Sequence, residues 1–149
     1  MLPVAQRVEK QVLRFRTACQ AAGITVTNQR LAIYKTLAGS TEHPAAEVVW
    51  DNVRKQLPAV SLDTVYRAFR LFEQLGLLTR VETGQNHARF DGNLEPHHHF
   101  VCTRCGTVFD FESASADAVA LPASVREMGI AESIRLEVRG VCSKCREEE

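Results

Sequence analysis

Residues 61–91, SLDTVYRAFRLFEQLGLLTRVETGQNHARFD, join a helical pattern to a hairpin pattern. Apolar residues recur at spacings of three, four and three, which puts them on one face of a helix: Leu62, Val65, Phe69 and Phe72. Ser61 suits the cap before this helix, and Gly76 suits the stop after it. The segments LLTRVE and HARFD then alternate like two short strands around the turn residues 83–86. This stretch therefore predicts a helix followed by a two-stranded hairpin.

Three more helices are predicted before this stretch, over about residues 5–22, 27–37 and 44–57. Thr27 is a suitable N-cap for the second, and Pro44 fits the first turn of the third. Several helices followed by a hairpin are the outline of a winged helix-turn-helix. Short strands are predicted near residues 100–102, 107–112 and 133–142, with a helix near 114–128 that Pro122 interrupts. The fold class is thus α+β, with an N-terminal winged helix-turn-helix domain before a small C-terminal α/β domain.

We place the DNA-binding domain at residues 1–84, a hinge at 85–96 and the second domain at 97–149, because glycines and a proline gather near the junction. The chain of 149 residues is 45% hydrophobic and 24% charged, as in ordinary globular proteins. No apolar run approaches the roughly 18–20 residues that a membrane span needs, and the N-terminus lacks the pattern of a secretory signal. We expect a cytoplasmic protein whose thiols stay reduced.

The net charge of zero conceals two unlike halves. Residues 1–91 hold 12 Lys and Arg against 8 Asp and Glu, whereas residues 92–149 hold 6 against 10. A basic first half favours a polyanionic partner for that half alone.

Two C-x2-C motifs, 36 residues apart, supply four cysteines: Cys102, Cys105, Cys142 and Cys145. A two-residue gap lets both thiolates of one motif reach a single ion at about 2.3 Å, and two such motifs complete a closed tetrahedron. The spacing therefore predicts one structural zinc ion that staples a domain with a limited core. The alternative is a pair of redox dithiols or disulfides, but redox C-x-x-C motifs usually occur singly beside a βαβ pattern that is absent here.

A second set of polar residues lies between the halves, in DGNLEPHHH at 91–99. Side chains alternate along an extended segment, so His97 and His99 share one face and His98 points the other way. Asp110 is brought close to them by the first cysteine motif. Nitrogen and oxygen donors without thiolate suit Fe(II) or Mn(II), and less selectively Zn(II) or Ni(II). A solvated turn is an equally good interpretation of these residues alone, and His43 alone reads as a capping or surface residue.

Five motifs together resemble the ferric uptake regulator family over nearly the whole chain: TNQRLAIY (27–34), HPAAEVVW (43–50), VSLDTVYRAFRLFEQLGLL (60–78), HHHFVCTRCG (97–106) and GVCSKC (140–145). The resemblance implies a homodimeric, metal-dependent transcriptional repressor that binds a palindromic double-stranded DNA operator. It also implies that the C-terminal domain mediates dimerisation and that the four cysteines hold structural zinc.

Within the family, the chain is most similar to the peroxide-stress regulator branch. That similarity implies an Fe(II) or Mn(II) site at His43, Asp91, His97, His99 and Asp110, and oxidation by hydrogen peroxide at His43 or His97. Asp91 matters most, because iron-sensing members usually carry Glu there. Residues 132–135, Glu-Ser-Ile-Arg, lack the histidine of a further site that iron and zinc sensors often have.

On DNA, the helix from Ser61 is expected to enter the major groove, with phosphate or base contacts from a set of polar residues: Arg30, Ser61, Thr64, Tyr66, Arg67 and Arg70. Arg80 and Arg89, in the wing, are further phosphate candidates. An ordinary solvated face is the alternative interpretation of these arginines.

Three rival functions remain open at this stage. The same fold could sense iron or zinc availability instead of peroxide. A zinc hydrolase would need an open metal position and a general base, as in His-Glu-x-x-His, and that motif is absent. A structural zinc module that binds only proteins would leave the basic half unexplained. We therefore expect no enzymatic activity, no small-molecule substrate and no membrane partner.

Overall fold

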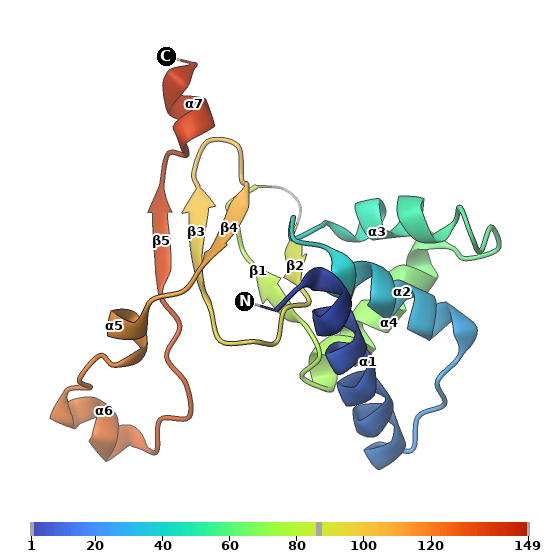
Figure 1. Cartoon of the computed structure of the whole chain (residues 1–149), viewed down its shortest axis with the longest axis horizontal. Helices are drawn as coiled ribbons and strands as arrows, with labels where there is room; N and C mark the ends of the chain where they lie inside the picture. Colours follow the sequence, from blue (N-terminus) through green and yellow to red (C-terminus); the bar gives the residue numbers. More distant parts are fainter. Residues whose placement is uncertain (1, 86–87, 149) are drawn as a thin grey trace. The chain divides into compact units, whose positions relative to one another are not determined.

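The computed structural model describes residues 2–85 and 88–148 (Figure 1). Asn86, in the predicted turn of the hairpin, and His87, at the start of its predicted second strand, lie outside the described residues. The chain divides into two compact units, Met1–Leu94 and Glu95–Glu149, which we call unit 1 and unit 2. The functional limits 1–84, 85–96 and 97–149 stay predictions. Within the described part, no helix is long and apolar enough to cross a bilayer.

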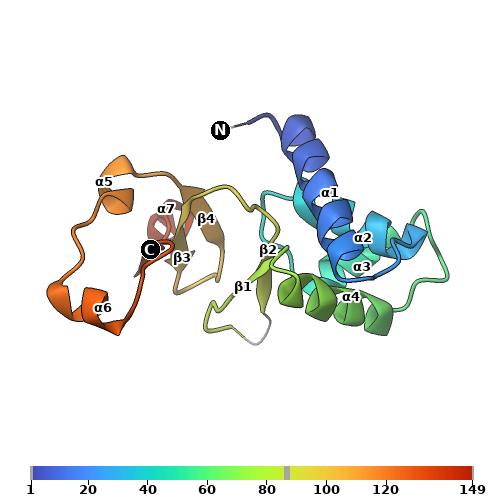
Figure 2. The ribbon, with the colours of Figure 1, turned by 90° about the horizontal axis from the view of Figure 1, so that it is seen from below.

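Unit 1 contains four helices and a hairpin: α1 (Val4–Ala21), α2 (Asn28–Gly39), α3 (Ala46–Val53), α4 (Leu62–Gln74), β1 (Thr79–Val81) and β2 (Arg89–Asp91). The predicted caps are present, because the side chains of Thr27 and Ser61 accept hydrogen bonds from the backbone amides of Arg30 and Thr64 at 3.2 and 3.1 Å. Strands β1 and β2 pair antiparallel, and Figure 2 shows this hairpin at the C-terminal end of α4.

An aromatic cluster lies at the centre of unit 1. Phe15 stacks on Tyr34 with ring centroids 4.7 Å apart, and Phe72 meets both rings edge-on at 5.4 and 5.3 Å. These residues come from α1, α2 and α4, so one contact holds three helices together. Phe69 and Phe90, 4.6 Å apart, extend this packing from α4 to the hairpin. The winged helix-turn-helix arrangement and the α+β fold class are thereby confirmed.

The start of the third helix differs from the prediction. Helix α3 begins at Ala46, so placing Pro44 in its first turn was wrong. Pro44 is instead held outside the helix, because its carbonyl accepts a hydrogen bond from the Phe90 amide at 3.1 Å. The preceding residue, His43, has a φ of 50°, the positive φ of a left-handed residue that cannot continue into a helix.

Unit 2 is built on a three-stranded sheet: β3 (His98–Cys102), β4 (Val108–Phe111), α5 (Ala114–Asp117), α6 (Ala123–Met128), β5 (Glu137–Gly140) and α7 (Ser143–Glu147). Strand β3 lies in the middle, antiparallel to β4 and parallel to β5 (Figure 1). A parallel pair needs a long crossover, which here carries β4, α5 and α6.

The predicted interruption near Pro122 is confirmed, because the stretch 114–128 is two short helices and Pro122 is the N-cap of the second, α6. The C-terminal helix α7 was not predicted. It begins after Cys142, whose sulfur lies 3.5 Å from the Cys145 amide at the helix start.

Candidate metal centres and nucleic-acid interface

The four cysteines of the two C-x2-C motifs gather at one end of the unit 2 sheet, with sulfurs within 4.8 Å of one another. Cys102 ends β3, and Cys105 follows in the turn. Cys142 follows β5, and Cys145 lies in α7. The sulfurs of Cys105 and Cys142 are 3.8 Å apart, and the edge of a tetrahedron with Zn–S arms of about 2.3 Å is also about 3.8 Å. The cluster has the donors and the spacing of a closed zinc site.

The thiols of this cluster differ in acidity. The backbone amides of Cys105 and Cys142 point at the Cys102 sulfur and lower the pKa of that thiol to about 6. The Thr107 hydroxyl, 3.2 Å from the Cys105 sulfur, lowers the pKa of Cys105. The hydrogen bond with the Cys142 sulfur raises the pKa of Cys145 to about 12, and burial and the charge of Cys102 add to the rise. A divalent cation would remove this conflict by stabilising all four thiolates together.

A second cluster lies on the same sheet, where β3 begins. His99 and Asp110 are opposite each other in the β3–β4 pairing, with His99 Nε2 3.2 Å from Asp110 Oδ1. His97 Nε2 lies 3.5 Å from the same oxygen and 3.0 Å from His99 Nε2. The Nδ1 of His97 lies 2.6 Å from the Glu95 carbonyl oxygen, so it carries the proton and leaves the Nε2 lone pair available.

His98 faces away from this cluster, as the alternation of an extended chain requires. Its Nδ1 accepts a hydrogen bond from the Leu136 amide at 3.1 Å. Its Nε2 must then carry the proton, and it lies 2.9 Å from Asp117 Oδ1. His98 therefore ties β3 to α5 and to the segment before β5.

Unit 1 contributes a smaller pair of candidate ligands. His43 lies between α2 and α3, and Asp91 ends β2. His43 Nε2 is 3.6 Å from Asp91 Oδ2, and the other carboxylate oxygen accepts a hydrogen bond from the Asn93 amide at 2.8 Å. Both side chains are buried. The left-handed backbone of His43 costs roughly 1–3 kcal/mol, a cost that persists where surrounding structure or function requires it.

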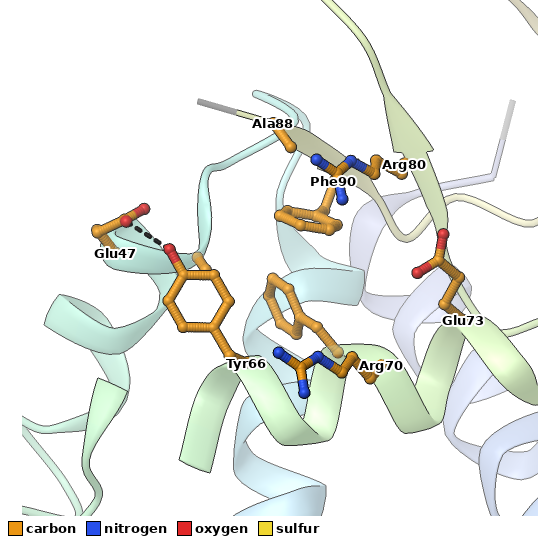
Figure 3. A pocket seen from close by; sticks show the side chains of 9 residues that line it. Glu47, Tyr66, Arg70, Glu73, Arg80, Ala88 and Phe90 are labelled. Atoms are coloured by element: carbon orange, nitrogen blue, oxygen red, sulfur yellow. Dashed lines mark hydrogen bonds between the residues drawn. The ribbon is translucent and has the colours of Figure 1, made fainter. Parts of the chain in front are cut away.

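The hairpin and α4 border a pocket of about 310 Å³, shown in Figure 3. Arg70 enters it from α4 and Arg80 from β1. Tyr66 donates a hydrogen bond to Glu47 Oε1 at 2.6 Å, which raises the pKa of the tyrosine. Glu73 adds a second carboxylate to the lining. Two cationic side chains on facing elements, above an aromatic floor, can hold an extended anion such as a sugar–phosphate backbone.

Three other predicted DNA contacts line a second hollow of unit 1, on another face of α4. Arg30, Thr64 and Arg67 line a hollow of about 370 Å³ between α2 and α4. Arg67 forms an exposed ion pair with Asp63 at 2.8 Å, and such pairs exchange readily because they contribute only about 0–1 kcal/mol. Ser61 acts as the cap of α4.

Comparison with known proteins gives a family match over residues 21–138, to the ferric uptake regulator family model. The chain belongs to this family. It is 34% identical, over 85% of both chains, to a peroxide-responsive repressor of Staphylococcus epidermidis. Its fold is similar to that of the ferric uptake regulator of Helicobacter pylori, with a TM-score of 0.74 at 21% identity over 95% of both chains. It is also similar to a zinc uptake regulator solved with zinc and DNA, with a TM-score of 0.61 at 21% identity, covering 95% of this chain and 96% of that one.

The two clusters of candidate ligands in this family member contain different donor atoms and so suit different metal ions. The cysteine cluster supplies only sulfur and leaves no open position, which suits a structural zinc ion. His97, His99 and Asp110 supply two imidazoles and one carboxylate, the donor set of non-haem Fe(II) sites. The 3.0 Å between the two imidazole nitrogens matches adjacent corners of an octahedron with arms of about 2.1 Å.

Several polar residues near these sites were missed from the sequence. Glu47 and Glu73 gave no signal, because each reads as an ordinary charged residue on a helix surface. Arg7 and Gln11, on α1, are buried. Their positions on the apolar face of the 5–22 helix were the one available indication, because a polar residue on such a face needs a partner.

We expect Cys142→Ser to abolish stoichiometric zinc binding and to unfold unit 2 at a lower temperature, because zinc binding contributes about 10–16 kcal/mol in small zinc domains. Elemental analysis and thermal denaturation measure both effects. Cys19→Ala is the matched control, since it removes a thiol buried in unit 1 and should keep the zinc. Full zinc content in Cys142→Ser would contradict the assignment.

Proposed function

We propose that the chain is a cytoplasmic, homodimeric, metal-dependent DNA-binding repressor that senses hydrogen peroxide. The observation that carries this proposal is the set of thiolate-free donors, His97, His99 and Asp110 in unit 2 with His43 and Asp91 in unit 1. Its donors favour redox-active Fe(II) or the less reactive Mn(II). The family relative from Staphylococcus epidermidis, a peroxide-responsive repressor, supports the same function.

The regulatory ion would bind all five residues together. Five donors would hold the ion more tightly than either half-set, the two donors of unit 1 or the three of unit 2, because fewer coordination positions are then left to water. Asp91 and His97 also lie close together in the sequence, on either side of the boundary between the units. An ion bound to both half-sets would favour the arrangement of the two units that brings the half-sets together. The size of this effect equals the difference in the ion's affinity between that arrangement and the others.

This arrangement would connect the metal to DNA binding. In the homodimer, a fixed arrangement of the units sets the distance between the two α4 helices. That distance must match two half-sites of a palindromic operator, about one turn of DNA apart. The zinc ion has a different role in this proposal, because the cysteine cluster stabilises the sheet that carries His99 and Asp110.

Peroxide sensing would use the ligand histidines themselves. Bound Fe(II) would supply the electrons that activate hydrogen peroxide, whereas Mn(II) supports DNA binding without that reactivity. In the net reaction, one oxygen atom of hydrogen peroxide bonds to an imidazole carbon of His43 or His97, and the other leaves as water. The oxidised ring is a poorer donor, so the half-sets separate and the operator is released. This histidine is consumed, so the process is a switch and not an enzymatic turnover.

On the DNA, α4 would enter the major groove with the β1–β2 hairpin beside the backbone. Arg70 and Arg80 line one pocket between these elements, and Arg30 and Arg67 line a second hollow between α2 and α4. Tyr66 would present its ring to the bases while Glu47 holds its hydroxyl. The family's fold is also that of a regulator solved with DNA, which supports a DNA partner.

Iron-loaded protein treated with peroxide should gain one oxygen atom on a peptide containing His43 or His97, and lose operator affinity. Peptide mass spectrometry and a DNA-binding titration, on the same samples, check the two effects. The manganese-loaded protein is the control and should keep both its mass and its affinity. Unmodified peptides with unchanged DNA affinity in the iron-loaded sample would overturn peroxide sensing.

Asp91→Glu should reduce peroxide sensitivity and leave metal-dependent DNA binding in place. The longer carboxylate keeps the donor but alters its distance from His43, which changes the coordination geometry. The peroxide concentration that releases half of the DNA is the measurement. If the variant releases DNA at the same peroxide concentration as the wild type, Asp91 does not set the peroxide response, which counts against the assignment to the peroxide-stress branch.

Arg70→Ala should weaken operator binding and reduce the slope of log affinity against log salt by about 0.9, the value for one lost phosphate contact. Fluorescence anisotropy at several salt concentrations measures the slope. Arg126→Ala, on α6 of unit 2, is the control and should leave it unchanged. An unaltered slope in Arg70→Ala would remove this residue from the DNA interface.

A further inference from the structure

Two polar side chains on the inner face of α1 are almost completely buried. Arg7 is 3% exposed and Gln11 is 0% exposed. They lie four residues apart, so they occupy one face of the helix a turn from each other. Buried polar groups of this kind are retained where they form specific hydrogen bonds. Both bond to backbone that is distant in sequence: Gln11 to the residue after Asp91, and Arg7 to residues five and three positions before His43.

Gln11 reaches the segment that carries Asp91. Its Nε2 donates a hydrogen bond to the carbonyl of Gly92, the residue after Asp91. The backbone at Gly92 is pressed against α2, where an added Cβ would lie 3.0 Å from Leu37 Cγ and 3.1 Å from the Leu37 carbonyl oxygen. Asn93 then donates its amide to the Asp91 carboxylate at 2.8 Å. The turn that orients Asp91 is thus held by α1 on one side and α2 on the other.

Arg7 reaches the segment that carries His43. Its guanidinium donates a hydrogen bond to the carbonyl of Ala38 at 3.3 Å and lies 3.5 Å from that of Ser40. These carbonyls are at the end of α2, where the chain turns toward His43 and its left-handed backbone. A charged donor on such carbonyls satisfies groups that the helix leaves unpaired. One helix therefore contacts both backbone segments that lead to the His43–Asp91 pair.

We propose that Arg7 and Gln11 are positioning residues for the regulatory metal, which hold His43 and Asp91 in the geometry that binds it. This inference rests on the proposed function. The two segments are otherwise a loop and a strand end, whose backbone freedom would have to be lost when an ion binds. Hydrogen bonds from α1 remove that freedom before binding. Outer partners of metal ligands typically change affinity by about 10–100-fold when they are removed.

Gln11→Met tests the inference, because it keeps the length and the apolar contacts of the side chain and removes its donor. The full-length, zinc-replete protein is titrated with Mn(II), with free Mn(II) followed by electron paramagnetic resonance. We expect the dissociation constant for Mn(II) to rise about tenfold or more, with unchanged zinc content and with DNA binding recovered at saturating Mn(II). Gln20→Met, at an exposed position of the same helix, is the control and should match the wild type.

A spectroscopic measurement separates positioning from a general loss of stability. Co(II) bound at the regulatory site has visible ligand-field bands that report the geometry of its donors. These bands should shift in Gln11→Met and not in Gln20→Met. Arg7→Lys keeps the charge but loses the planar fork, and it should weaken Mn(II) binding in the same direction, which provides a second test if Gln11→Met does not fold.

The outcomes distinguish this inference from the proposed function. If the wild type binds Mn(II) and both variants bind it within twofold of that affinity with unshifted Co(II) bands, only the positioning role is overturned. If the wild type itself binds no metal ion beyond its zinc, the regulatory site and the positioning role both fall.

Discussion

The chemistry of unit 2 depends on the pairing of its central strand, β3, with β4 on one side and β5 on the other. One neighbour, β4, follows β3 directly, whereas β5 returns after a long crossover. A small sheet with a parallel pair has little apolar surface to hold that distant strand. The cysteine cluster joins the ends of β3 and β5 at one point, and His98 joins β3 to the segment before β5. The cysteine cluster and the His98 imidazole therefore help to hold β5 in a sheet whose apolar core is small.

The pairing of β3 also explains how one sheet can carry two separate clusters of candidate metal ligands. The cysteines follow the ends of β3 and β5, while His99 and Asp110 face each other earlier on β3 and β4. The register of β3 and β4 places His99 opposite Asp110, and the His97 Nε2, from the segment just before β3, lies 3.0 Å from the His99 Nε2. Thiolates select zinc and close its coordination, whereas the nitrogen and oxygen donors leave positions for further ligands. The cysteine cluster thus lies on the same strand, β3, as His99 of the second cluster.

In unit 1, the packing of aromatic side chains, rather than a cluster of cysteines, positions the polar groups. Its helices are fixed by the aromatic cluster of Phe15, Tyr34 and Phe72, and the polar side chains are arranged around that packing. On the α4 side, two arginines and two glutamates line one pocket, where Glu47 accepts the Tyr66 hydroxyl and Arg80 is paired with Glu82. On the α1 side, buried donors hold the backbone near His43 and Asp91. The same packing therefore positions the arginines that line the pocket beside α4 and the backbone on either side of the His43–Asp91 pair.

The amino-acid sequence by itself determined the features that local chemistry controls. Helix caps at Thr27 and Ser61, the cysteine spacing and the alternation of the three histidines all depend on residues close together in the chain. The tertiary structure alone decided the rest. The hydrogen bonds of Arg7 and Gln11 cross 31 and 81 residues, and that of Tyr66 with Glu47 crosses 19. Contacts over such separations arise only when packing brings distant backbone together, and no local pattern encodes which partner is met.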